Sequence, residues 1–222
     1  MKIAQNGLEF ELSFTDSSAQ LISSNEAKGD IIIPSSIMYQ SKDYIITSIG
    51  DNSFKNNTNI VSISFPEDSQ IKTINKFAFF FCSLQKISIP STVTRIDEFS
   101  FYISDNLRFV SIPDDSKILS FEKYAFSKSL IEHIKIPSSV QYIGEFAFFG
   151  CEKLKTVEIH EDSQLKIIDN YSFSCTLIDS IFITEKVKEI HDSSFYNCSR
   201  LKAINFSEKS ELVSIGYEAF SM

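Results

Sequence analysis

The chain has 222 residues, 43% of them hydrophobic and 23% charged, and its net charge is −8. This length suits one ordinary domain or one elongated repeat array, and the composition excludes a disordered or membrane-embedded protein. The negative charge, with no basic stripe, argues against nucleic acid or an anionic membrane as the main partner. Four cysteines are too few for a disulfide scaffold. Phenylalanine occurs 21 times and tryptophan never, which indicates one motif used repeatedly.

The N-terminal stretch MKIAQNGLEFELSF contains no continuous apolar run, so it predicts no signal peptide. No segment approaches the roughly 18 apolar residues of a transmembrane helix, and we expect no membrane insertion. Three alternatives for the location remain open: the cytosol, export by an unconventional route, or flanking segments that lie outside this sequence.

Residues 1–50 are predicted to form an N-terminal cap and the first repeat. GDIIIPSS (29–36) is the first copy of a strand motif that recurs along the chain. Nine more residues separate Pro34 from Ile49 than separate Pro90 from Ile96. We expect this insertion, around MYQSKDY (38–44), to form a hairpin that covers the first edge of the array.

From residue 51 onward the chain repeats. An Ala-Phe or Ser-Phe pair recurs in steps of 25 and 22 residues that alternate strictly, and it ends at Phe54, Phe79, Phe101, Phe126, Phe148, Phe173, Phe195 and Phe220. The three extra residues of the longer units lie in PEDSQI (66–71), PDDSKI (113–118), HEDSQL (160–165) and SEKSEL (207–212). Such a period is the signature of stacked repeats, since one unit cannot bury its apolar side alone.

Each unit contains the pattern L-x-x-I-x-I-P, seen for example in LQKISIP (84–90), whose last residues alternate in the manner of a half-buried strand. A second apolar residue precedes each ladder phenylalanine by five positions. One unit is therefore strand, turn, short strand and a tight or 3₁₀ bend. The eight phenylalanines form a core ladder along the axis.

These motifs identify the chain as similar to the BspA-like, Treponema-type leucine-rich repeat family over roughly residues 29–222. NGLEFELSF (6–14) and YIITSIGDNSF (44–54) resemble capping segments of that family. The resemblance implies a single leucine-rich repeat domain over 1–222. It would be a right-handed, curved stack of about eight repeats, mainly β with short 3₁₀ or helical turns. The repeat array would occupy 51–222, with no evident C-terminal cap.

One face of the array is a candidate binding site. The second and third x residues of the strand motif point outward and are mostly polar, but Phe109 and Phe182 are aromatic. An aromatic side chain on the concave face of a solenoid suits a protein anchor, although scattered apolar surface residues are also normal. Both interpretations stay open. The candidate protein-binding residues are Lys86, Phe109, His133, Lys135, Glu158 and Phe182.

The cysteines are interpreted as structural. Cys82, Cys151 and Cys198 follow a ladder phenylalanine by three residues and Cys175 by two, so all four are assigned to one small, buried slot before the strand. A redox or metal site on consecutive turns is the alternative, but no C-x-x-C motif and no histidine supports it.

Catalysis is not expected. His160 and His191 take loop positions predicted to be solvated, and His133 points out from a strand near Lys135 and Glu158. The sequence contains no triad spacing and no glycine-rich phosphate loop, and the acidic turns lack the spacing of a Ca²⁺ loop. We predict no catalytic residue, no cofactor and no metal.

A second aromatic row stands two residues before the ladder, at Phe77, Phe99, Tyr124, Phe146 and Tyr171. Ring stacking at the flank is favoured over an exposed stripe for self-association. Phe149 belongs to none of these rows.

The resemblance implies a non-enzymatic surface or secreted protein that binds host extracellular-matrix or cell-surface proteins. A cytosolic interaction scaffold is the alternative. Because the sequence stops two residues after Phe220, the last repeat is expected to expose an apolar edge, which a homodimer could cover.

Overall fold

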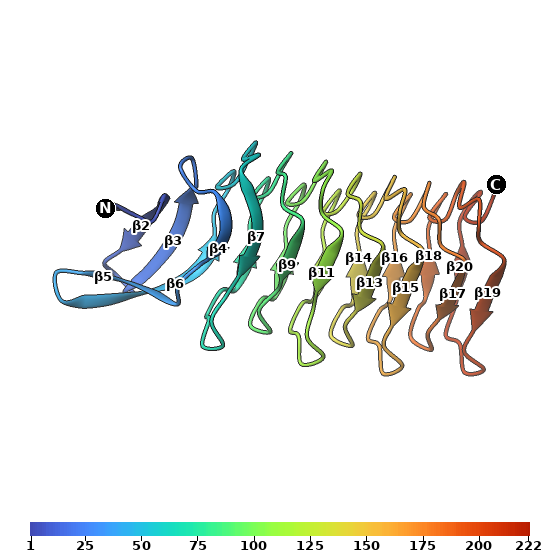
Figure 1. Cartoon of the computed structure of the whole chain (residues 1–222). Helices are drawn as coiled ribbons and strands as arrows, with labels where there is room; N and C mark the ends of the chain where they lie inside the picture. Colours follow the sequence, from blue (N-terminus) through green and yellow to red (C-terminus); the bar gives the residue numbers. More distant parts are fainter.

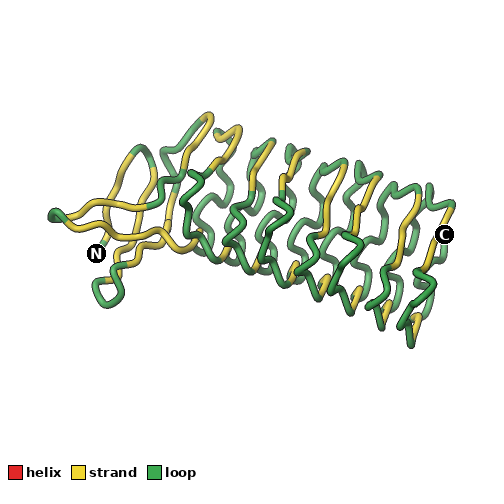
Figure 2. Tube along the Cα trace, turned by 90° about the horizontal axis from the view of Figure 1, so that it is seen from below, coloured by secondary structure: helices red, strands yellow, loops and turns green.

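The computed structural model describes residues 1–222, which form a β-solenoid of stacked turns (Figure 1). Each full turn carries one longer strand, one two-residue strand and the bend with the ladder phenylalanine. Figure 2 shows strands and loops only, so the chain has no helix of any length and none that could cross a membrane.

The N-terminal cap is a meander. Strands β1 (Lys2–Gln5), β2 (Leu8–Ser13) and β3 (Ser18–Ser23) pair antiparallel in order, and β3 then pairs parallel with β6 (Lys42–Ile49). The insertion forms the expected hairpin, because β5 (Ser36–Tyr39) pairs antiparallel with the start of β6. Positive φ angles of 49° and 62° at Gln40 and Ser41 suit such a tight turn. The first edge of the array is covered by β3 and not by this hairpin, which corrects that part of the expectation.

The two-residue strands extend this sheet in parallel along the solenoid. The sheet continues from β6 in chain order through β8 (Thr73–Ile74), β10 (Arg95–Ile96), β12 (Ser120–Phe121), β14 (Tyr142–Ile143), β16 (Ile167–Ile168), β18 (Glu189–Ile190) and β20 (Ser214–Ile215). Their second residues point into the core, and all except Ile215 are fully buried.

The longer strands form the opposite wall, which we name the long-strand face. They are β4 (Gly29–Ile32), β7 (Ile60–Ser64), β9 (Lys86–Ser88), β11 (Phe109–Ser111), β13 (His133–Ile136), β15 (Thr156–Ile159), β17 (Ser180–Ile183) and β19 (Ala203–Phe206). This wall is not one sheet: β4, β7, β9 and β11 pair together, then β13 with β15, then β17 with β19. The pairing is interrupted after β11 and after β15, the strands that the longer turns 113–118 and 160–165 follow.

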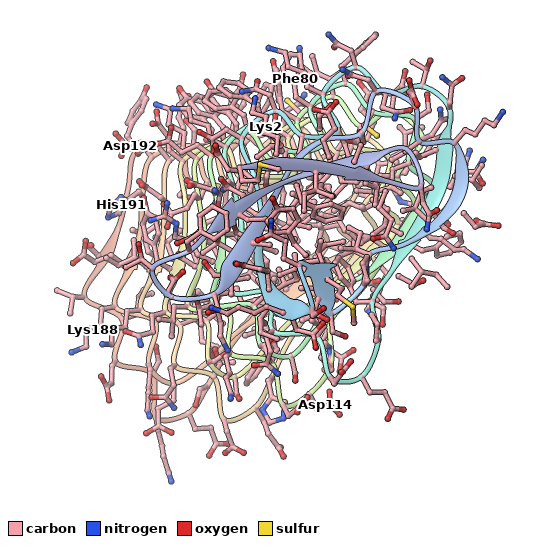
Figure 3. The ribbon with its side chains drawn as sticks, turned by 90° about the vertical axis from the view of Figure 1, so that its left-hand side faces the viewer. Lys2, Phe80, Asp114, Lys188, His191 and Asp192 are labelled. Carbon is pink, nitrogen blue, oxygen red and sulfur yellow. The ribbon has the colours of Figure 1, made fainter.

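Viewed along the axis, the solenoid has distinct sides (Figure 3). Asp114, on a longer turn, lies at one edge and Phe80 at the opposite edge, while Lys188, His191 and Asp192 lie on a third side. The long-strand face and the side that carries the two-residue strands are therefore separate surfaces. A rim of turns joins them at one edge. At the other edge lies the aromatic flank, which is the row Phe77, Phe99, Tyr124, Phe146 and Tyr171.

The phenylalanine ladder fills the core. The first seven members are fully buried, and consecutive rings stack with centroids 4.8–5.5 Å apart. The widest of these separations, between Phe126 and Phe148, occurs where Phe121 packs edge-on against both rings. Aromatic stacking at this distance adds to the burial of apolar area.

The bend around each ladder phenylalanine is not helical, which corrects the expected 3₁₀ or helical turns. The residue two positions before every ladder phenylalanine has a positive φ, and so does the residue two positions after the first seven. A right-handed helical turn cannot pass through such residues. Backbone hydrogen bonds to the next repeat hold the bend instead, as from Phe79 N–H to Ser100 O at 2.6 Å.

The small slot before each strand has the predicted role for three of the four cysteines. Cys151 and Cys198 donate to Phe126 O and Phe173 O, each at 3.2 Å, and Cys82 is buried in the same slot. The assignment of Cys175 to this slot is wrong. Thr176 fills the slot there, while Cys175 is half-buried at a positive-φ position, because it lies one residue earlier in the unit.

The alanine of the Ala-Phe pair is replaced by serine in several repeats, and two of these give a test. The Ser100 hydroxyl is buried without a partner, whereas the Ser194 hydroxyl donates to His191 O. An unpaired buried hydroxyl is unfavourable. Ser100→Ala should therefore leave stability unchanged or raise it by up to about 1 kcal/mol, and Ser194→Ala should lower it by about 1 kcal/mol. Urea denaturation of both variants measures the difference, and equal losses would contradict it.

Candidate functional site

The six candidate binding residues all lie on the long-strand face. Lys86 stands opposite Phe109 across β9 and β11, and Lys135 stands opposite Glu158 across β13 and β15. Phe182 on β17 stands opposite Asn205 on β19. Phe109 is 63% exposed and Phe182 49% exposed, because the alternation of the strands places the isoleucines inside and these rings outside.

The interruption between β11 and β13 opens a groove of about 450 Å³. The two strands lie side by side but form no β-ladder, and a hydrogen bond from Glu132 N–H to Arg108 O is long, at 3.4 Å. Phe109, His133 and Lys135 line the groove together with Arg108 and Glu132. Arg108 and Glu132 were not predicted from the sequence, because they precede the strand positions that point outward.

Charges in and beside the groove are mostly paired. Arg108 Nη1 lies 3.1 Å from Glu132 Oε1, and Lys135 pairs with Asp114. His133 Nδ1 lies 2.6 Å from Thr156 Oγ1, and its Nε2 lies 3.9 Å from Glu158 Oε2. Lys86 makes no ion pair. The groove thus combines one exposed ring with fixed polar groups, an arrangement suited to an amphipathic protein surface.

The structure does not bring the two exposed phenylalanines together. Phe109 borders the first interruption of the face and Phe182 the second, with the β13–β15 pair between them. Three strand-to-strand steps separate their strands, and two of these steps are the interruptions themselves. They are two separate contact points on one surface.

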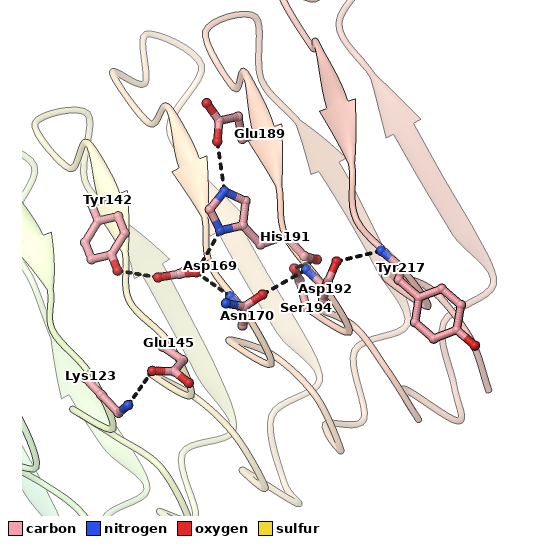
Figure 4. A network of polar contacts seen from close by, with 10 residues as sticks. All are labelled: Lys123, Tyr142, Glu145, Asp169, Asn170, Glu189, His191, Asp192, Ser194 and Tyr217. Atoms are coloured by element: carbon pink, nitrogen blue, oxygen red, sulfur yellow. Dashed lines mark hydrogen bonds and ion pairs between the residues drawn. The ribbon is translucent and has the colours of Figure 1, made fainter.

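A second polar cluster lies on the side of the two-residue strands (Figure 4). His191 is held between two carboxylates, with Nδ1 2.8 Å from Asp169 Oδ1 and Nε2 2.8 Å from Glu189 Oε2. Tyr142 O–H and Asn170 N–H also donate to Asp169. The loop position expected for His191 is confirmed, since it directly follows β18. The ring is half-buried and bound on both sides, so the expectation of a solvated side chain is only partly correct. Stacking of the turns places carboxylates of the preceding turn and of its own strand on both ring nitrogens.

The cluster shifts the protonation of its members. Burial opposes charge on His191, but the hydrogen bonds to Glu189 and Asp169 outweigh it and raise the pKa of the ring. Burial likewise opposes charge on Asp169, yet hydrogen bonds from Tyr142, Asn170 and His191 lower its pKa. The carboxylates occupy both ring nitrogens, and Ser194 O–H donates to the His191 carbonyl and not to the ring. The two carboxylates therefore hold the His191 ring in place, which indicates a structural role for the cluster.

This cluster predicts a pH dependence. A histidine whose pKa is raised in the folded state contributes its stabilisation fully below its unfolded pKa of about 6.5 and loses it as pH rises through the folded pKa. His191→Gln should therefore lower the free energy of unfolding by roughly 1 kcal/mol at pH 6 and by less at pH 9. Urea denaturation across this range measures the trend. His133→Gln, on the exposed face, is the matched control, and the same trend in both would contradict the assignment.

Two of the four thiols are poorly reactive because they are buried. Burial raises the pKa of Cys82 and of Cys151 to about 12, so both stay protonated at neutral pH and are poor nucleophiles. All four cysteines are free, and no group of three or more His, Cys, Asp or Glu side chains is placed to hold a metal ion.

The aromatic flank is stacked, as the sequence predicts. Consecutive rings from Phe77 to Tyr171 have centroids 4.7–4.9 Å apart and are nearly parallel. The Lys55 ammonium lies 5.4 Å from the centroid of the Phe77 ring at the start of the row. Because each ring covers the face of the next, the flank presents ring edges and not open faces.

The last turn exposes apolar side chains. Val213, Tyr217 and Met222 are 81%, 74% and 82% exposed, and Ile215 is half exposed, unlike its buried counterparts in earlier turns. No further turn of this structure lies against them.

The sequence pattern described as "BspA type Leucine rich repeat region (6 copies)" matches residues 31–136 and 119–222. No curated protein is significantly similar to the chain in sequence. Among solved structures, the pneumococcal vaccine antigen PcpA superposes with a TM-score of 0.67 at 22% identity, covering 94% of this chain and 50% of the PcpA chain. The present chain thus spans half the length of that antigen.

Two further structures are similar. A leucine-rich repeat protein from Bacteroides ovatus has a TM-score of 0.66 at 20% identity, over 98% of this chain and 79% of its own. The leucine-rich repeat protein TpLRR of T. pallidum has a TM-score of 0.58 at 17% identity, over 97% and 86%. At these identities the similarity concerns the fold alone. The repeat pattern, however, matches nearly the whole solenoid, and the chain belongs to the BspA-type leucine-rich repeat family.

Proposed function

We propose that the chain is a protein-binding module that contacts its partner through the long-strand face, with Phe109 and Phe182 as anchors. The observation that carries the proposal is the exposure of these two rings at the two interruptions of the face. The other outward side chains of the middle strands are mostly polar, and the exposed Ile32 lies at the N-terminal end of the face on β4. Aromatic anchors surrounded by polar groups contribute most of the binding energy in many protein interfaces. Lys86, His133, Lys135 and Glu158 would form the polar surroundings.

The family resemblance supports a proposal for the partner class. PcpA is described as a vaccine antigen, and we propose by analogy that this chain acts at a cell surface, where it would bind host extracellular-matrix or cell-surface proteins. Antibody labelling of intact, unpermeabilised cells tests the location. Labelling only after permeabilisation would favour a cytosolic interaction scaffold and contradict the surface assignment.

A pull-down with purified matrix proteins tests the binding face. Phe109→Ser/Phe182→Ser should weaken capture at least about tenfold, since loss of a hot-spot residue costs more than about 1.4 kcal/mol. Phe81→Ser is the matched control, because Phe81 is comparably exposed but lies outside the strands of the long-strand face. Capture that survives in the double variant, or falls equally in the control, would contradict this face as the binding site.

Self-association through the last turn is the second candidate function, favoured by the exposed Val213, Tyr217 and Met222. A homodimer would cover these side chains. Light scattering of the chain with and without an appended capping repeat provides the test. A dimer that the appended repeat abolishes is the expected result, and a monomer in both forms would contradict it.

A further inference from the structure

A notch lies on the rim of turns at the edge of the long-strand face. The longer turns 66–71 and 113–118 flank the shorter turn after β9, and the lower rim in Figure 1 alternates accordingly between deeper and shallower loops. The notch between these turns holds about 270 Å³. Phe65, Pro66, Pro90 and Pro113 provide its apolar lining, and Glu67 and Asp115 provide carboxylates.

The two carboxylates of the notch have neither a counter-ion nor a hydrogen-bond donor, unlike their neighbours. Asp68 accepts a hydrogen bond from Ser35 Oγ, and Asp114 pairs with Lys135. Glu67 and Asp115 take part in no ion pair. Two unpaired negative charges beside an apolar floor attract a cationic group that carries an apolar stem.

Ser69 supplies an independent observation. It lines the notch, is only 3% exposed, and its hydroxyl has no hydrogen-bond partner. At the equivalent position of the other longer turns, the hydroxyl accepts from the N–H two residues later, at 3.1–3.3 Å, in Ser116, Ser163 and Ser210. A buried polar group normally has a partner. The Ser69 hydroxyl therefore lacks the N–H donor that the other longer turns supply from their own backbone.

We propose that this notch binds an arginine side chain of a protein partner. The aliphatic stem would pack on Phe65 and the prolines, and the guanidinium would pair with Glu67 and Asp115. The Ser69 hydroxyl is buried in the structure, and rotation of its side chain toward the notch would let Oγ accept a hydrogen bond from the guanidinium. Arginine fits better than lysine because its planar group offers five donors in fixed directions and stacks on flat surfaces. The partner would lie on the long-strand face, so in this respect the inference rests on the proposed function.

An NMR titration of the full chain with N-acetyl-arginine N-methylamide tests the notch directly. We expect saturable shifts at the amides of Ser69, Ser88, Ser91 and Asp115. The isosteric neutral citrulline derivative should give none, and the lysine derivative should bind several-fold more weakly. Shifts that are absent from these amides, or equal among the three compounds, would overturn the proposal.

Two pairs of variants sharpen the test. Glu67→Gln/Asp115→Asn should weaken binding of the arginine derivative about tenfold, since charge-assisted contacts are lost. Glu161→Gln/Asp162→Asn removes the same charge from another longer turn and should leave the affinity unchanged. Ser69→Ala should weaken binding, whereas Ser163→Ala should not. Equal effects within either pair would overturn the assignment.

The notch and the aromatic anchors of the long-strand face can be tested separately. Phe109→Ser/Phe182→Ser removes the anchors of the face but no residue of the notch, so binding of the arginine derivative should be unchanged in that variant. Partner capture that depends on the anchors while the derivative does not bind would overturn the notch alone. Binding of the derivative without anchor-dependent capture would overturn the anchors alone.

Discussion

Phe148→Ala is expected to lower the free energy of unfolding by about 3–5 kcal/mol, the range for large-to-small changes at aromatic core positions. The Phe148 ring is fully buried and stacks on Phe126 and Phe173 at 5.5 and 5.1 Å, with the edge of Phe121 at 5.5 Å. The cavity cannot collapse easily, because hydrogen bonds between successive turns, such as Phe148 N–H to Ser172 O at 2.7 Å, fix the spacing between the bends.

Urea denaturation followed by circular dichroism measures the loss. Phe220→Ala is the matched control, since Phe220 is only partly buried and stacks on one ladder ring, Phe195. We expect it to cost less than half as much. A loss at Phe148 no larger than at Phe220 would show that the ladder does not carry the stability of the array. Because repeats contact only their neighbours, Phe148→Ala could also split the transition into two steps.

The repeat period allowed most of the fold to be predicted from sequence. Eight copies in one frame define which residues share a row, and a row that is apolar in every copy must face the core, whatever the details of the turns. The ladder, the inward isoleucines and the outward Lys86, Phe109 and Phe182 all follow from this frame. The backbone conformation within one repeat could not be predicted as well, because the repeat pattern shows which residues share a row but carries no information on dihedral angles.

Phe149 illustrates this limit. In the structure its ring packs edge-on against Phe146, with centroids 5.4 Å apart. Phe80 and Tyr102 take the equivalent position in earlier turns and pack in the same way on Phe77 and Phe99. The position directly after the ladder phenylalanine therefore supports the flanking row. Serine at this position in other repeats, such as Ser127 and Ser174, hid the row in the sequence.

Features that depend on contacts between turns could not be predicted. The two interruptions of the long-strand face depend on how neighbouring repeats stack, so the groove beside Phe109 has no signal in a single repeat. The acidic neighbours of His191 are Glu189 on its own strand and Asp169 on the preceding turn, and Asp169 is close only in three dimensions. The missing partner of Ser69 likewise emerges only when the four longer turns are compared in three dimensions.

The second large effect is expected on the aromatic flank, where Phe99→Ser/Tyr124→Ser should lower the free energy of unfolding by roughly 2–4 kcal/mol. Three stacked pairs are lost, with centroids 4.7–4.9 Å apart, and each contributes about 0.5–1.5 kcal/mol. Urea denaturation measures the loss, and light scattering should show no change in oligomeric state. Unchanged melting together with lost self-association would mean that the flank is an exposed association stripe.

The backbone at Phe99 permits a sharper test, because its φ of 56° lies in the left-handed region that bulky residues rarely occupy. Glycine adopts this region freely, whereas alanine pays roughly 1 kcal/mol. Phe99→Gly should therefore be more stable than Phe99→Ala by about 1 kcal/mol, the reverse of the order in a helix or strand. At Glu98, which has no positive φ, glycine should be the less stable of the two. The inverted order at Phe99 alone would show that ring stacking holds an aromatic residue in a conformation its backbone disfavours. The same order at both positions would remove that explanation of the row.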